Sequence, residues 1–121
     1  MTEQQARLDL QRRQRLGMVE AIWGEHKTTE QIHEILKKLQ LAGELAFVTR
    51  VGIEKANKLK VFFETAEFHS MARCLTLGTP AELIPSLGKV VVLSGGTSDL
   101  HVAAEAELAL RLHGIQTEFL L

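Results

Sequence analysis

One short segment of the chain combines residues that could bind an anion. It lies between an apolar run and an alanine-rich stretch and consists of Ser94, Gly95, Gly96, Thr97, Ser98 and Asp99. Two glycines allow the backbone to approach a ligand closely, and the free N–H groups and the dipole at the start of a following helix favour negative charge. We therefore take residues 94–99, the diglycine turn, as a candidate phosphate site.

The side chains of the diglycine turn offer two roles. Thr97 and Ser98 supply hydroxyl donors, while Asp99 would cap the helix or accept a hydrogen bond from a ribose hydroxyl. The pattern is neither GxGxxG nor a Walker A loop. A purely structural role is therefore favoured as much as anion binding. In that role, Ser98 or Asp99 caps the helix, and the glycines only turn the chain.

Basic residues near the N-terminus are a second candidate site. Arg12, Arg15 and Lys27 could hold a phosphate or a carboxylate, because guanidinium groups match both anions. The same residues could equally form a structural network with Asp9 and Glu20. The structural or interface role is slightly favoured, because no glycine loop or helix N-terminus accompanies them.

The remaining reactive and aromatic side chains predict structural roles. Cys74 is the single cysteine, which excludes an internal disulfide and a CxxC metal site and favours a reducing, cytoplasmic setting. We expect its thiol to be buried and inert. None of the five histidines has the spacing of a zinc site, and His69 is expected at a strand end. Trp23 and Phe47 are predicted core residues.

The composition excludes several classes of protein. The chain has 121 residues, with 14 basic and 15 acidic side chains and a net charge of −1. This balance gives no electrostatic footprint for nucleic acid or for an anionic membrane surface. No apolar run approaches the roughly 20 residues of a membrane span, and the polar N-terminus predicts no secretory signal.

The first two thirds of the chain alternate between short apolar runs and amphipathic stretches. A capping-box spacing at Thr28 and Gln31 starts one helix, Gly43 ends it, and its apolar face is Ile32, Ile35, Leu36 and Leu39. The other predicted elements are a helix over 4–16, a strand or extended turn at 19–23, strands at 45–49, 68–70 and 73–77, and a helix over 53–60. Residues 61–63 either finish that last helix or start a strand.

The last third predicts a strand, a glycine turn, a helix and a second strand. Residues 89–93 form a β-branched run typical of a strand buried on both faces, residues 100–113 a helix, and residues 115–121 a second strand. This βαβ unit needs further strands to complete a sheet. We predict an α/β protein with a small mixed N-terminal domain over 1–85. The first, incomplete βαβ unit of a doubly wound three-layer domain follows over 86–121.

Three sets of residues resemble a known enzyme family. The run Val90–Leu100, with Val102, Ala103, Glu105 and Ala106, resembles the start of the catalytic domain of the LarB family. The spacing Asp9, Arg12, Arg15, Gly17, Glu20, Ile22, Gly24, Lys27 and Thr28 resembles its N-terminal signature, and Thr49-Arg50 resembles its Thr-Arg pair. These proteins are pyridinium-3,5-biscarboxylic acid mononucleotide synthases of nickel-pincer cofactor synthesis, related to the carboxyaminoimidazole ribonucleotide mutases.

The resemblance implies a reaction and its substrates. The family carboxylates the pyridinium ring of nicotinic acid adenine dinucleotide with carbon dioxide or bicarbonate, and cleaves the phosphoanhydride to release AMP. An enzyme thiol adds to the ring during the reaction. By analogy, Gly96, Thr97, Ser98 and Asp99 would hold the ribose phosphate, and Glu105 would assist proton transfer or bind a metal. The resemblance fixes no cofactor and leaves Mg²⁺ open.

The family's reactive cysteine lies downstream of Leu121, which leaves two hypotheses. In one, the chain belongs to the carboxylase family and is itself inactive. In the other, it is a non-catalytic fragment or one half of a split protein and acts as a binding or interaction domain. Exposed strand edges predict association, either as a homo-oligomer or with a missing C-terminal half.

Overall fold

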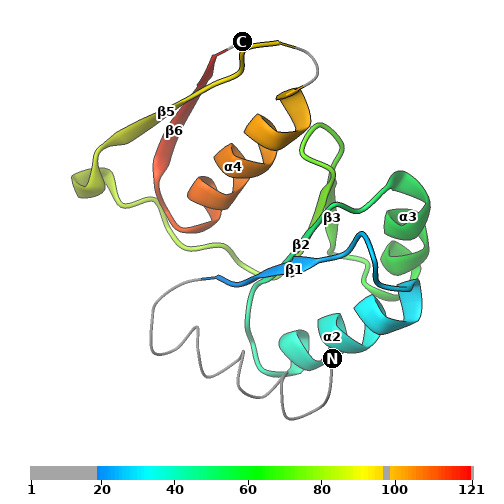
Figure 1. Cartoon of the computed structure of the whole chain (residues 1–121). Helices are drawn as coiled ribbons and strands as arrows, with labels where there is room; N and C mark the ends of the chain where they lie inside the picture. Colours follow the sequence, from blue (N-terminus) through cyan, green and yellow to red (C-terminus); the bar gives the residue numbers. More distant parts are fainter. Residues whose placement is uncertain (1–18, 97–98, 121) are drawn as a thin grey trace.

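The computed structural model describes residues 19–96 and 99–120 (Figure 1). The predicted helix over 4–16 lies outside these residues, as do Arg12, Arg15, Thr97 and Ser98. The described elements are β1 (Ala21–Trp23), α2 (Thr29–Leu41), β2 (Ala46–Thr49), α3 (Ile53–Phe62), β3 (Glu67–His69), β4 (Cys74–Leu77), a 3₁₀ turn (Pro85–Leu87), β5 (Lys89–Leu93), α4 (Leu100–Leu112) and β6 (Gln116–Leu120).

The strands form two sheets, which confirms the α/β class. The first sheet has the order β1-β2-β4-β3, in which β1 and β2 are parallel and the other pairs are antiparallel. In the second, β5 and β6 pair in parallel and α4 connects them, as the βαβ pattern predicts. The domain division at residue 85 stays a prediction. Within the described ranges, no helix has the length and apolarity of a membrane span.

Helix α2 begins and ends as its sequence predicts. The Thr28 hydroxyl accepts a hydrogen bond from the Gln31 N–H at 3.1 Å, and the Gln31 side chain accepts one from the Thr28 N–H at 2.9 Å. These two bonds satisfy donors that the first helical turn leaves unpaired. Gly43 follows the helix with a φ of +70°, a conformation that glycine adopts without steric cost.

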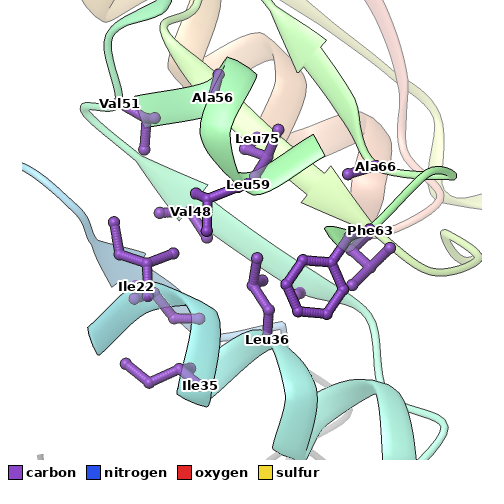
Figure 2. Close-up of a cluster of buried hydrophobic side chains, with 13 residues drawn as sticks. Ile22, Ile35, Leu36, Val48, Val51, Ala56, Leu59, Phe63, Ala66 and Leu75 are labelled. Carbon is purple, nitrogen blue, oxygen red and sulfur yellow. The ribbon is translucent and has the colours of Figure 1, made fainter. Parts of the chain in front are cut away.

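Strand β2 separates two clusters of buried side chains, because successive residues of a strand point to opposite faces. Ala46 and Val48 belong to the first cluster, which α2 and α3 cover (Figure 2). Leu45 and Phe47 belong to the second, which Leu108 and Leu112 of α4 complete. Helix α4 therefore covers the opposite face of the first sheet as well as the β5–β6 pair.

Three hydrogen bonds made by histidines add to this packing of α4. The His101 ring donates from Nδ1 to the Met71 carbonyl at 2.8 Å. Near the other end of the helix, the Val19 N–H donates to His113 Nε2 at 2.9 Å, and His113 Nδ1 donates to the Ala109 carbonyl at 2.7 Å. The helix is thus attached to the rest of the chain at both ends.

Two burial predictions are wrong. Strand β5 is largely exposed, with Val91 at 48% and Leu93 at 72%, because β6 is its single partner strand in the described chain and α4 covers one face. Trp23 is 51% exposed, because β1 is an edge strand and its neighbour Ile22 takes the inward-facing position. Phe47 is buried as predicted. Val61 and Phe62 finish α3 instead of starting a strand.

Candidate functional site

Gly95 and Gly96 of the diglycine turn lie open, just after the carboxyl end of β5. Gly95 and Gly96 are exposed, and a Cβ added to either would meet nothing within 4 Å. Ser94 holds the turn, since its N–H donates to Leu120 O at 2.9 Å and its hydroxyl to Gly96 O at 2.9 Å. The backbone here has room for a ligand, and its phosphate role stays a prediction.

Asp99 occupies the N-cap position of α4 without capping it through its side chain. Its carboxylate makes no hydrogen bond to the first turn of the helix, so the predicted capping bond is absent. Asp99 donates its N–H to Gly96 O at 3.3 Å, which continues the turn directly into the helix. Asp99 is exposed, and its other predicted role, accepting a hydrogen bond from a ribose hydroxyl, stays a prediction.

A cavity of about 420 Å³ lies between the first sheet and the N-terminal half of α4. Three connections and one helix line it, with the residues Glu25, Arg50, Val51, Gly52, Ala72, Arg73, His101, Val102 and Glu105. A volume of this size falls within the roughly 300–1,000 Å³ of small-molecule sites. We call it the arginine cavity.

Arg50 and Arg73 reach this cavity from unusual backbone conformations. Their φ angles are +56° and +52°, and they are the non-glycine residues with positive φ in the described chain. Each such conformation costs on the order of 1–3 kcal/mol and persists where the surrounding structure imposes it. The Val51 N–H donates to Arg73 O at 2.9 Å, so the two turns are joined directly.

Neighbouring groups fix the position of Arg50. Its guanidinium carbon lies 4.8 Å from the centre of the Trp23 ring, a cation–π contact. The Trp23 indole N–H in turn donates to the Glu25 carboxylate at 3.1 Å. The exposed tryptophan therefore supports an arginine at the mouth of the cavity, which explains its departure from the predicted core.

Cys74 lies behind the arginine cavity and is not a nucleophile there. Its side chain is fully buried, and its thiol donates to Ala72 O at 3.2 Å. Burial, together with the negative charge of Glu105, raises the pKa of Cys74 from 9.0 to about 12. The predicted burial of Cys74 is confirmed, and a thiol with this pKa stays protonated at neutral pH, as an inert cysteine would.

The structure brings together some predicted site residues and not others. Glu105 lines the arginine cavity, whereas Gly95, Gly96 and Asp99 do not. Lys27 contributes its carbonyl, which accepts a hydrogen bond from Lys55 Nζ at 2.7 Å. The roles predicted for Arg12, Arg15, Thr97 and Ser98 concern residues outside the described ranges.

Sequence reasoning missed two basic residues near the arginine cavity. Lys55 also donates to Gly24 O at 3.2 Å and Glu25 O at 3.4 Å, so it fixes the loop after β1. Arg73 precedes β4 in a turn with no motif of its own. For Arg73, the one signal in the sequence was a basic residue between two short strands. Arg50 appeared in the sequence analysis only within the Thr-Arg pair.

A smaller cavity of about 150 Å³ lies at the other end of the same helix face. His69, at the end of β3 as predicted, bonds through Nε2 to the Thr76 hydroxyl at 2.9 Å. Burial lowers the pKa of His69, against the raising effect of Glu67. Arg111 and Glu107 form an ion pair beside it, and Glu107 also accepts from Thr117. These contacts describe a structural network.

Comparisons with known proteins agree with the resemblance in the sequence. The profile of the LarB/PurE-like N-terminal domain matches residues 2–79. An uncharacterised protein of Methanocaldococcus jannaschii is 29% identical over 119 residues, which cover 94% of this chain and 46% of that protein. The chain therefore spans about half the length of this relative.

Proposed function

Because the chain belongs to the LarB/PurE-like N-terminal domain family, we propose that it forms part of a carboxylase of nickel-pincer cofactor synthesis. Its substrates would be nicotinic acid adenine dinucleotide and carbon dioxide or bicarbonate, with release of AMP. The arginine cavity is the observation that carries the proposal. It gathers two arginines, a histidine and Glu105 between the family domain and the helix that follows the diglycine turn.

The proposal assigns the dinucleotide to two neighbouring places. The open backbone at Gly95 and Gly96 and the start of α4 would accept a phosphate, and the arginine cavity would accept the part of the substrate that reacts. Glu105 is half-buried and lines the arginine cavity, and this placement suits a group that moves a proton to or from a bound ligand.

The reactive thiol of the proposed reaction comes from outside the described residues. Cys74 is the chain's one cysteine, and its burial and raised pKa keep it protonated. Among residues 19–96 and 99–120, no three His, Cys, Asp or Glu side chains converge as metal ligands would, and the proposal routes no step through Mg²⁺. We therefore expect the 121-residue chain to bind the dinucleotide without turnover.

A binding or interaction domain is the second candidate function, and the exposed β5–β6 pair favours it. Val91 and Leu93 present apolar surface to solvent, and each strand of the pair has one unpaired edge in the described chain. Such a surface suits association with a second copy or with a companion half. On this reading the chain would bind a protein and have no affinity for the dinucleotide.

Two measurements separate these functions. Equilibrium dialysis of the purified chain with nicotinic acid adenine dinucleotide should show saturable binding. Mass spectrometry after incubation with isotopically labelled bicarbonate should show no carboxylated ring. A chimera in which this chain replaces the aligned half of the Methanocaldococcus jannaschii protein should form the carboxylated product and AMP. Failure of both binding and turnover would refute the carboxylase proposal.

A further inference from the structure

The arginine cavity has features that define the kind of group it binds. We infer that Arg50 and Arg73 bind a single carboxylate attached to a positively charged planar ring, and that this pair distinguishes an acid from the corresponding amide. The inference rests on the proposed function and deepens it. It assigns a specificity-determining role to two residues and states which end of the substrate they contact.

The backbone holds the two arginines in unusual conformations. Both residues adopt left-handed conformations, with φ of +56° and +52°, which glycine, asparagine and aspartate adopt more readily than arginine does. The bond from the Val51 N–H to Arg73 O, 2.9 Å long, joins the turn after β2 to the turn before β4. Strain of this kind clusters at ligand-binding sites, and these two strained residues line one cavity.

The two guanidinium groups prefer an anion of a particular shape. A guanidinium presents parallel N–H donors that match the two oxygens of a carboxylate. The Trp23 ring lies 4.8 Å from the guanidinium carbon of Arg50 and orients that group. Arg73 lines the same cavity, and we infer that a planar carboxylate bound there accepts from both side chains.

The charged side chains that line the cavity balance one another. Glu25 and Glu105 line it together with Arg50 and Arg73, so two negative side chains accompany two positive ones. This balance leaves no excess positive charge for a dianionic phosphate. A ligand with a carboxylate next to a cationic ring matches it, because the arginines attract the carboxylate and the glutamates attract the ring.

The size and the lining of the cavity agree with a ring-sized ligand. The volume of about 420 Å³ exceeds what a bare carboxylate needs and accommodates a six-membered ring with its substituent. Val51, Ala72 and Val102 contribute apolar lining, which suits the faces of such a ring. His101 is held by its bond to Met71 O at 2.8 Å, so this wall keeps its position.

Two small probes isolate the carboxylate from every other property of the ligand. N-methylpyridinium-3-carboxylate and N-methylpyridinium-3-carboxamide share the ring and its positive charge and differ in the acid alone. In NMR titrations of the 121-residue chain, we expect the carboxylate to bind at least about tenfold more tightly. Inorganic phosphate at the same concentration should displace none of it.

The variant Arg73→Gly separates binding from folding. Glycine adopts a φ of +52° without steric cost, so the melting temperature should be no lower than that of the wild type, while the preference for the carboxylate should be lost. Arg50→Gly should also lose the preference. Lys58→Gln, which removes an exposed positive charge from α3 outside the cavity, is the matched control and should leave the preference unchanged.

Two results would overturn the inference. One is equal binding of the acid and the amide by the wild type, and the other is displacement of the carboxylate by phosphate, which would make the cavity a phosphate site. Both are distinct from a failure of the proposed function. A chimera that carboxylates the dinucleotide while the chain binds both probes equally would retain the function and refute this specificity. An inactive chimera with an intact acid preference would refute the proposed function and retain this specificity.

Discussion

Replacement of Gly24 by alanine tests how closely the loop after β1 approaches the first sheet. A Cβ at this position would lie 2.8 Å from Val51 Cγ2, 2.9 Å from Val48 Cγ1 and 2.9 Å from Thr49 O. The Gly24 N–H also donates to that same Thr49 oxygen at 2.8 Å. The added methyl group would thus press against the atom that accepts the glycine's own hydrogen bond.

The cost of this substitution follows from the rigidity of the three neighbours. Val48 and Val51 are fully buried, and a β-branched side chain has one strongly preferred rotamer. Thr49 O is a backbone atom within β2. No flexible side chain can yield, so we expect the upper part of the range for overpacking, about 2–3 kcal/mol of unfolding free energy.

Urea denaturation followed by circular dichroism measures this loss. With an m-value of about 1.5 kcal/mol per molar, the midpoint should fall by about 1.3–2 M. Gly95→Ala is the control, because a Cβ there meets nothing within 4 Å and the residue lies outside the left-handed region. It should change the unfolding free energy by less than about 0.5 kcal/mol. Similar midpoints for the two variants would show that the close approach at Gly24 is wrong.

Three further perturbations have defined outcomes. Cys74 should resist a thiol reagent at pH 8 until denaturant is added, and fast labelling of the folded chain would contradict this. The contribution of Cys74 to the unfolding free energy is complete below pH 9 and should decline as the pH rises toward the folded pKa of about 12. Burial lowers the pKa of His69 from 6.5, so its contribution to the unfolding free energy is complete above pH 6.5 and is lost as the pH falls. The wild type should therefore lose more unfolding free energy between pH 7.5 and 5.5 than His69→Gln does. His113→Ala should cost about 1–3 kcal/mol, because it leaves the Val19 N–H without its acceptor, while the exposed His26→Ala should be neutral.

The local patterns in the sequence predicted the elements well because their causes are local. The capping residues and the spacing of apolar side chains lie within α2, and both are found in the fold. Strand β2 was also readable, since residues 45–48 are all apolar. The fold shows why: each face of this strand packs against a different helix layer.

The arginine cavity could not be predicted because its walls come from distant parts of the chain. Arg50 and Arg73 are 23 positions apart by their numbers and meet through a single backbone bond, Val51 N–H to Arg73 O. Their positive φ angles depend on that tertiary contact and leave no trace in composition or spacing. Glu105 was found through resemblance, and its partners across the cavity were not.

The placement of α4 connects the predicted phosphate site with the arginine cavity. The helix begins at the diglycine turn and presents His101 and Glu105 to the cavity within its first two turns. Its packing on β2 and its bonds to Met71 O and from the Val19 N–H fix that orientation. A ligand held by the start of α4 would therefore extend along a rigid helix toward the two arginines. Under the proposed function, the family domain and the βαβ unit would therefore form a single binding surface.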